Sequence, residues 1–416
     1  MWLIHGKKYD LTAFINKHPG GADILMRTKD QEDISALFET SHAFSNKLQI
    51  NWTLNKYEII PEDLIESNSS NLNKIFHPAM YSTSYNFNHY DRLVDQIRTL
   101  YPNRSSIKAP VSYYLRNLIV LALYIWCFYL AMFSDLNTLY RCLLSFVASL
   151  CWISLGFNVM HDASHNAICS NVWINIILAK LWNSWGCWNR NIWFYHHVMY
   201  HHQFTGLVND PNVYHYRPMA RKNKTDKPIF GSEFGAWMIN FVSIIFPGFY
   251  YGQSISYSLA SRDESLFGIK LPSIAYYNVF DKILIVIHLA CLYQGLWLPT
   301  IIYMIANNLF YHLNVAFGHD MYETSVRNHY EGKDWFLLCV RNSGNFLNQS
   351  MLWTLWFGGS NYQIEHHLFP TMSHVHYPVI APIVRSYCRE NSIPYVHHPT
   401  LTAAYRSFLK TMEFNS

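Results

Sequence analysis

Four long stretches of the chain carry no charged side chain, and they constrain the fold more than any other feature. Residues 117–134 and 142–160 each suit one membrane-crossing helix, which needs about 20 apolar residues. Residues 283–319 are long enough for two such helices, and Pro299 divides them. The pattern predicts two helical hairpins, with spans at about 115–134, 140–160, 282–298 and 299–318.

The fourth uncharged stretch, residues 234–261, is interrupted by a Pro-Gly pair. A further span there would separate the two large polar segments, residues 166–233 and the chain after residue 319. Each segment carries seven basic residues, whereas the turn between the first two spans carries only Arg141. The positive-inside rule places both segments in the cytosol, so we expect residues 234–261 to lie along the membrane interface.

Composition narrows the classes of protein that the chain can belong to. Charged residues make up 14% of the 416 residues and hydrophobic residues 50%, against about 25% charged in an average soluble domain. Disorder, collagen and a small disulfide scaffold are excluded, and a net charge of +4 gives no sign of nucleic-acid binding. The N-terminus shows no signal peptide, and eight cysteines without a CxxC pair predict buried, reduced thiols.

Histidine is unusually frequent, with 22 residues against 31 Lys+Arg, and its clusters flank the predicted spans. Side chains at i, i+3 and i+4 share one face of a helix, so each cluster presents its imidazoles in one direction. The topology predicted above brings all clusters to the cytosolic face. The candidate metal-site residues are His161, His165, His197, His201, His202, His319, Gln363, His366 and His367.

Neutral imidazole binds Zn, Cu, Fe and Ni, and this set is large enough for two metal ions. A single HxxxH pair is often a surface or core pair, but three clusters beside membrane segments favour a metal centre. The role of His196 stays open. Four acids flank the clusters, either orienting imidazole N–H groups or solvated: Asp162, Asp210, Asp320 and Glu365. We expect structural or solvated roles for His77, His89, His215, His288, His312, His329, His374, His376, His397 and His398.

The first 60 residues form a separate module, and residues 61–110 form a linker that begins with a run rich in Ser, Asn and acids. Pro-Gly-Gly at 19–21 forces a turn beside His18, and His42 follows 24 residues later among aromatic residues. Two imidazoles in a small apolar pocket can serve as axial ligands to a haem. This stretch resembles cytochrome b5, and the resemblance covers about residues 2–58.

Taken together, the HPGG module, HDASH at 161–165, HVMYHHQFTG at 197–206 with NDP after it, and QIEHH at 363–367 resemble the cytochrome b5-fusion membrane fatty-acid desaturases of the front-end type. Gln363, where other membrane desaturases have a histidine, marks front-end and sphingolipid-type members. The resemblance implies a mostly α-helical fold. A small α+β cytochrome b5-like domain precedes a four-transmembrane-helix histidine-box domain, residues 111–416, with a cytosolic helical cap.

The same resemblance implies two irons at the histidine boxes, haem b on His18 and His42, and O2 as co-substrate. It implies a multi-pass enzyme of the endoplasmic reticulum membrane that takes electrons from NADH-cytochrome b5 reductase and acts on a fatty acyl chain. The acyl chain would enter from the bilayer. Tryptophans at 152, 182, 185, 188 and 193 are candidates for the tunnel lining, although an interfacial or core position is the simpler interpretation of each.

Three alternatives remain open from the sequence. A desaturase of sphingolipid long-chain bases shares the fold and boxes. A b5-fused fatty-acid hydroxylase uses related iron chemistry, although QIEHH and the box spacings argue against it. A membrane haem protein with a vestigial metal site predicts at least one incomplete box, and all boxes are complete.

Overall fold

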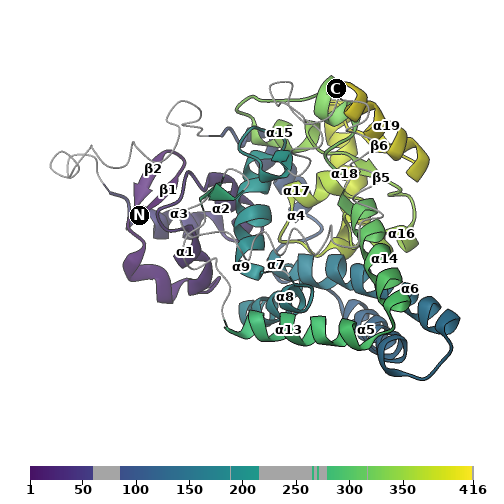
Figure 1. Cartoon of the computed structure of the whole chain (residues 1–416). Helices are drawn as coiled ribbons and strands as arrows, with labels where there is room; N and C mark the ends of the chain where they lie inside the picture. Colours follow the sequence, from purple (N-terminus) through teal and green to yellow (C-terminus); the bar gives the residue numbers. More distant parts are fainter. Residues whose placement is uncertain are drawn as a thin grey trace. The chain divides into compact units, whose positions relative to one another are not determined.

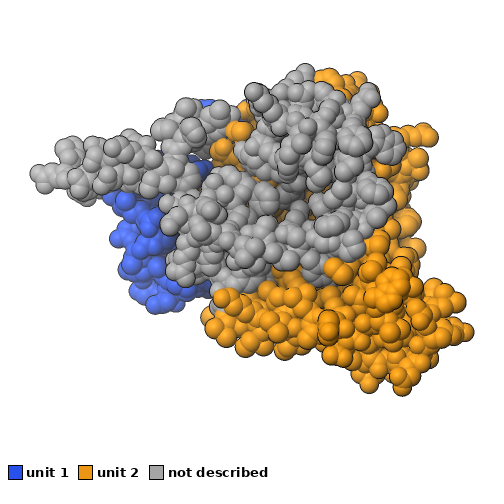
Figure 2. All heavy atoms as spheres, in the orientation of Figure 1, with its two compact units in different colours: residues 1–104, 332–336 blue, residues 105–331, 337–416 orange. Residues whose placement is uncertain are grey.

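The computed structural model describes residues 1–59, 85–187, 189–214, 265–266, 269–270, 279–315 and 317–414. The expected interfacial stretch 234–261, the histidines at 77 and 215, Trp188 and the first half of the linker lie outside them. The chain forms two compact units (Figure 2): unit 1 comprises Met1–Arg104 and Gly332–Phe336, and unit 2 comprises Ser105–Glu331 and Leu337–Ser416. Each unit is described by itself.

Unit 1 begins with a hairpin of β1 (Trp2–Ile4) and β2 (Lys7–Tyr9). Its turn residues, His5 and Gly6, both have positive φ (52° and 72°), as a two-residue hairpin turn requires. The alternation of the strand buries Trp2 and Ile4, and the Trp2 indole donates to the Leu25 carbonyl at 3.0 Å. The helices that follow are η1 (Thr12–Lys17), α1 (Ala22–Thr28), α2 (Ser35–His42), α3 (Lys47–Asn55) and α4 (Asn88–Arg98) (Figure 1).

In unit 2, two helices among the described residues are long and apolar enough to cross a membrane. One is α5 (Val111–Phe133). The other is the continuous helix Thr138–Ser164, made of α6 (Thr138–Leu155), the π-helical η4 (Gly156–His161) and α7 (Asp162–Ser164). Arg141, which the sequence placed in the turn, lies in the first turn of α6; it is buried and donates to the carbonyl oxygens of Ala131 and Met132 at 2.8 and 3.0 Å. It therefore satisfies carbonyl groups that the end of α5 leaves open.

The second predicted hairpin falls on α13 (Val279–Gln294) and α14 (Trp297–Val315). Pro299 lies in the first turn of α14, where its missing N–H removes no helical hydrogen bond. α14 packs along α6, and α13 packs along α8 (Val172–Trp185). Neither α13 nor α14 is among the helices that are long and apolar enough to cross a membrane. The count of four spans therefore stays a prediction.

The polar part of unit 2 is mostly helical, as predicted, with short strands. Its helices are α9 (Arg190–Trp193), η5 (Phe194–His201), α10 (His202–Phe204), η6 (Pro211–Tyr214), η8 (Glu323–Arg327), α15 (Trp335–Arg341), α16 (Met351–Phe357), α17 (Gln363–Leu368), η9 (His374–His376), α18 (Tyr377–Glu390) and α19 (Leu401–Phe414). Its strands are β3 (Ser265–Leu266), β4 (Ile269–Lys270), β5 (Asn345–Phe346) and β6 (His397–His398). β3 pairs with β4 in antiparallel fashion, and β5 pairs with β6 in parallel fashion.

The parallel pair of β5 and β6 fixes the start of α17. Asn345 is fully buried; its side-chain oxygen accepts from the Ile364 N–H at 3.0 Å, and its amide donates to Glu365 at 2.7 Å. A buried cluster of aromatic residues that includes Phe317, Phe346 and Phe408 packs beneath this strand pair. The QIEHH sequence is therefore held by both its backbone and its acidic side chain.

Candidate metal centre and haem site

The predicted histidine clusters of unit 2 meet at one buried centre, where they form two groups. The first group contains His161, His165, His197 and His366, whose ligand nitrogens all lie within 4.8 Å of one another. The Nε2 atoms of His161 and His197 are 2.9 Å apart. Nε2 of His165 and of His366 has no hydrogen-bond partner among the described residues. Buried nitrogens that converge in this way can ligate one metal ion.

The second group contains His201, His319 and His367, with Nε2 of His319 lying 3.1 Å from that of His201 and 3.0 Å from that of His367. Each Nδ1 is hydrogen-bonded on the outer side: His201 to Asp210 at 2.9 Å, His319 to the Asn342 carbonyl at 3.0 Å, and His367 to the Thr205 hydroxyl at 3.0 Å. Outer hydrogen bonds of this kind fix the tautomer and aim the other nitrogen at a metal.

His202 lies between the two groups. Its ring stacks on that of His367 with centroids 4.3 Å apart, and it meets His165 and His366 edge-on at 4.6 Å each. The side chain is buried, and both ring nitrogens lack a hydrogen-bond partner among the described residues. A buried imidazole without partners costs free energy, and a metal ion would remove that cost.

The helices that carry the first two boxes are not wound as regular α-helices. η4, which ends at His161, and η5, which ends at His201, are both π-helical. A π-turn widens the helix and re-aims side chains, and such turns are frequent at functional sites. Regular α-helical spacing, which predicts that His197 and His201 point in one direction, does not hold here, and the two residues belong to different groups.

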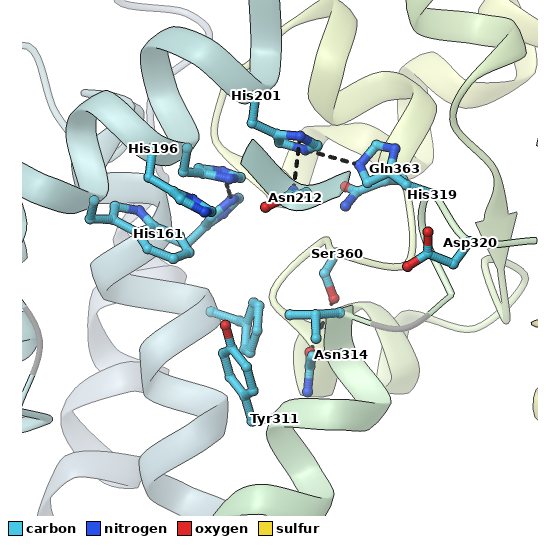
Figure 3. A pocket seen from close by; sticks show the side chains of 14 residues that line it. His161, His196, His201, Asn212, Tyr311, Asn314, His319, Asp320, Ser360 and Gln363 are labelled. Carbon is cyan, nitrogen blue, oxygen red and sulfur yellow. Dashed lines mark hydrogen bonds between the residues drawn. The ribbon is translucent and has the colours of Figure 1, made fainter. Parts of the chain in front are cut away.

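A cavity of about 70 Å³ lies beside the histidines and reaches both groups (Figure 3). His161 and His197 of the first group and His201 and His319 of the second line it, and Tyr311 and Asn314 reach it from α14. Its other lining residues are Phe157, Trp193, His196, Asn212, Val315, Asp320, Ser360 and Gln363. The cavity therefore adjoins both groups where α14 ends.

Gln363 belongs to neither histidine group but lines this cavity. Its side-chain oxygen is buried without a hydrogen-bond partner among the described residues. Gly318 leaves room for it, because a Cβ atom at residue 318 would lie 2.7 Å from Gln363 Cγ and 2.8 Å from its amide nitrogen. The side chain can thus turn its oxygen toward a ligand or metal in the cavity.

The centre is built for neutral imidazoles. Burial lowers the pKa of five of its histidines well below the ordinary value of 6.5, and neighbouring imidazoles lower it further. These are His165, His197, His202, His366 and His367. Since only the neutral ring has a free lone pair, the environment keeps the ligands ready for metal at physiological pH.

The four flanking acids have different roles. Asp210 accepts from His201, as a residue that orients an imidazole does. Asp162 instead accepts from Ser373 and from His374, at 3.1 and 2.9 Å. Glu365 accepts from Asn345 and Tyr395, and burial raises its pKa to about 7. All four are buried, including Asp320, which lines the cavity, so the solvated alternative does not apply to them.

The remaining histidines and tryptophans belong to neither ligand group, although Trp193 stacks on His197 with ring centroids 4.7 Å apart. Of the histidines expected to be structural or solvated, those at 288, 312 and 374 are buried, and those at 89, 329, 376, 397 and 398 are half-buried. His196 is buried on the cavity wall. Trp152 and Trp182 stack on each other with centroids 4.3 Å apart, and Trp185 donates to Tyr124, whereas Trp193 lines the cavity. All eight cysteines are free thiols.

In unit 1, the geometry of His18 and His42 fits a haem between them. Their ring centroids are 6.2 Å apart, close to the roughly 6 Å expected when two imidazoles bind opposite faces of one metal at about 2 Å each. His18 Nδ1 donates to the Gly21 carbonyl at 3.0 Å and His42 Nδ1 to the Phe38 carbonyl at 2.7 Å, which leaves Nε2 of each ring for iron. Burial lowers the pKa of both, that of His42 to about 4.

Sequence reasoning missed several residues that position the ligands. Thr205 lies three residues after His202, so a hydroxyl about one turn after a ligand pair was the available signal. Asn212 lies two residues after Asp210, and its side-chain amide is 2.8 Å from His201 Nδ1. Asn342 acts through its backbone carbonyl, for which residue type gives no signal.

Comparison with known proteins agrees with this architecture. The fatty acid desaturase family profile matches residues 136–399, and the cytochrome b5-like haem/steroid binding domain profile matches residues 1–66. The acyl-lipid (8-3)-desaturase of Mortierella alpina is 24% identical over 98% of this chain and 92% of its own length. A protein of the same name from Physcomitrium patens is 26% identical over 98% and 86%. The sn-1 linoleoyl-lipid 6-desaturase of Synechocystis is 26% identical over 73% and 88%.

A fatty acid desaturase domain with a fused cytochrome b5-like domain defines a membrane oxidoreductase with a haem-binding domain. Because the family profile covers more than half of its length, the chain belongs to the fatty acid desaturase family. The predicted fusion of a cytochrome b5-like domain to a membrane fatty acid desaturase is confirmed. The haem domain implies haem, and the family implies iron.

Proposed function

We propose that this enzyme performs front-end desaturation, which inserts a double bond between an existing one and the carboxyl end of a polyunsaturated acyl chain. The observation that carries the proposal is the pair of histidine groups beside one cavity. Relatives that cover nearly the whole chain bear the names of acyl-lipid desaturases, and Gln363 stands at the first position of the third box. The substrate class we infer is therefore a polyunsaturated acyl lipid.

We further propose that the centre holds two irons. The first group, His161, His165, His197 and His366, would hold one, and the second group, His201, His319 and His367, the other. Two further side chains would complete the sets of ligands around the two irons. These are His202, whose two ring nitrogens have no partner among the described residues, and Gln363 on the cavity wall. When bound, iron with O2 as co-substrate supplies the oxidant needed to remove hydrogen from an unactivated CH2 group.

The residues of the chain orient the metal ligands and shape the cavity beside them. Asp210, Thr205 and the Asn342 carbonyl hold the second group in one tautomer. The cavity adjoins both groups, so the reacting carbons would lie in it, and η4 and α14 supply part of its wall. Phe157 and Val315 are apolar residues of the cavity wall. Asn314 and Ser360 are polar residues of the same wall, and the Ser360 hydroxyl donates to the Asn314 side-chain oxygen at 3.0 Å.

Electron supply and location follow the same proposal. The haem domain passes electrons one at a time, taken from NADH-cytochrome b5 reductase, and its tether to the desaturase domain keeps it at a local concentration of about millimolar. The enzyme would lie in the endoplasmic reticulum membrane with four spans. Its haem domain and metal centre would face the cytosol, as the basic segments favour. Exposed apolar side chains on α13, such as Ile283 and Val286, are suited to lipid contact.

Product analysis tests the function. The full chain is expressed in a yeast that lacks polyunsaturated acids, candidate acids are supplied, and fatty-acid methyl esters and long-chain bases are read by mass spectrometry. We expect a new double bond on the carboxyl side of an existing one. Desaturated long-chain bases would point to the sphingolipid alternative, and hydroxylated acids to the hydroxylase. No new product in any lipid class would contradict the proposal.

A matched pair of variants ties the product to the centre. His367→Ala removes a ligand of the second group, whereas His398→Ala removes a half-buried histidine paired with Glu323 at 3.2 Å. We expect product to disappear in the first variant and to persist in the second.

A further inference from the structure

The first histidine box lies where a helix ends. It supplies His161, the last residue of η4, and His165, which follows α7 directly, to the first group of the metal centre. α7 is only three residues long, and the next residue, Asn166, has a positive φ of 55°. The last turn of a helix leaves carbonyl groups without helical partners, so contacts from elsewhere in the fold must help to fix the direction of this box.

The acidic side chain between the two ligands makes such a contact. Asp162 is buried, and its Oδ2 atom lies 2.9 Å from His374 Nδ1 and 3.1 Å from the Ser373 hydroxyl. An ionised carboxylate only accepts hydrogen bonds, so both of these groups donate to it. Ser373 and His374 follow the third box, and the first box is therefore bonded to a segment more than 200 positions further along the chain.

Asp162 is also the only hydrogen-bond partner of the His374 ring in the part of the chain that the structure describes. The side chain of His374 is fully buried, and its Nε2 atom has no partner there. Burying a polar nitrogen without a hydrogen bond costs free energy. An apolar side chain would fill the same space without that cost, so packing alone does not account for a histidine at this position.

The same histidine adjoins the loop that leads into the third box. Gly358 and Gly359 have positive φ, 58° and 81°, and precede α17, which carries His366. A Cβ atom at Gly359 would collide with the Cβ atom of His374, and one at Gly358 would collide with the backbone of Phe157 in η4. The loop before the third box therefore contacts both His374 and the helix that leads into the first box.

We propose that His374 is a positioning residue for the first metal group, acting through its hydrogen bond to Asp162. This bond fixes the first box relative to the third, so that His161 and His165 meet His366, whose ring centroid lies 4.4 and 4.9 Å from theirs. Partners outside the ligand set orient ligands in this way at many metal sites. The inference rests on the proposed metal centre and deepens it, because His374 belongs to neither ligand group.

The test compares two amides at residue 374 in the purified full chain. Counted in bonds from Cα, the side-chain nitrogen of asparagine stands where histidine has Nδ1, whereas that of glutamine stands farther out. His374→Asn therefore keeps a donor for Asp162, and His374→Gln removes it. His376→Gln is the matched control, because it changes a half-buried histidine of the same short helix, η9, whose Nε2 donates to the Lys108 carbonyl at 2.9 Å.

Two properties are measured in the wild type and in the three variants. One is the affinity of the centre for Fe²⁺, by competition with a chelator. The other is the Mössbauer spectrum of iron-57 added back after chelation, which reports the ligand geometry of the non-haem irons alone. We expect His374→Gln to bind iron about 10–100-fold more weakly and to change the spectrum. His374→Asn and His376→Gln keep the affinity and the spectrum of the wild type.

A role in packing alone predicts the opposite order, because glutamine is closer in size to histidine than asparagine is. Iron binding by His374→Gln that equals or exceeds that of His374→Asn, with an unchanged spectrum, would overturn the inference. If His374→Gln does not fold, His374→Asn decides: the wild-type spectrum supports the inference, and a changed spectrum overturns it. A wild-type chain that binds no non-haem iron would instead refute the proposed metal centre, and the inference with it.

Discussion

The two sites orient their histidines in opposite ways. At the haem site, each Nδ1 is held by a carbonyl three or four residues away, Gly21 for His18 and Phe38 for His42. At the metal centre, His367 Nδ1 is held by Thr205, 162 positions away along the chain, and His319 by the Asn342 carbonyl, 23 positions away. The proposed haem ligands are oriented by local structure, whereas His319 and His367 of the proposed metal centre depend on the assembled tertiary fold. Damage to one site should therefore leave the other intact.

The largest expected effect is the loss of the metal centre alone. His367→Ala removes one of three ligands of the second group, so we expect desaturation to be abolished and non-haem iron to fall by about half. The Soret band should be unchanged, because unit 1 does not contain this residue. We would measure desaturated product, non-haem iron and the Soret band in the same preparation. A variant that keeps full product would remove the second group from the proposed centre.

The reciprocal change is next in size. His18→Ala removes one proposed axial ligand, so we expect loss of the Soret band and little or no product, while non-haem iron stays at the wild-type value. Full product from this variant would contradict the fused-donor role, since a free cytochrome b5 would then be sufficient.

A smaller effect is expected outside the ligand shell. Thr205→Val keeps the shape of the side chain but removes the hydroxyl that accepts from His367 Nδ1. Loss of such an outer partner typically weakens metal affinity by about 10–100-fold, which a chelator competition of the purified protein would measure. Thr99→Val is the control, because Thr99 is exposed at the end of α4. Equal iron retention by both variants would show that the fold alone orients His367.

The mildest change probes Gln363. Gly318→Ala places a Cβ atom 2.7 Å from Gln363 Cγ, so the Gln363 side chain must move. We expect desaturation to slow by about tenfold, while the contents of haem and of non-haem iron are retained. Gly156→Ala is the matched control, because its added Cβ meets nothing closer than 3.7 Å. If Gly318→Ala desaturates as fast as Gly156→Ala, the position of Gln363 does not limit the reaction.

The sequence predicted the locally built haem site more completely than the metal centre, which depends on tertiary contacts. The HPGG turn, the second histidine and the aromatic residues around them lie within one short module, so His18 and His42 could be proposed as haem ligands from the sequence. The box histidines could also be recognised, and the structure brings them together. Their division into two groups could not be predicted, because His161 meets His197 and His319 meets His201 across segments far apart in the chain.

The fold shows the same limit. The long uncharged stretches of the sequence predicted α5 and the helix Thr138–Ser164. A membrane-crossing helix needs a continuous apolar segment, which can be recognised from local sequence. The π-helical winding of η4 and η5 has no comparable signal in residue type. The linker assignment of residues 61–110 rested on polar composition, yet α4 within it folds into unit 1, where Arg98 binds backbone carbonyls that composition does not reveal.

We propose that one chain holds a haem in unit 1 and two irons in unit 2. The ratio of non-haem iron to haem in the purified full-length protein tests it most directly, with iron measured by mass spectrometry and haem by its pyridine haemochrome. We expect about two non-haem irons for each haem, because seven histidines form two groups with His202 between them. One non-haem iron for each haem, or none, would contradict it.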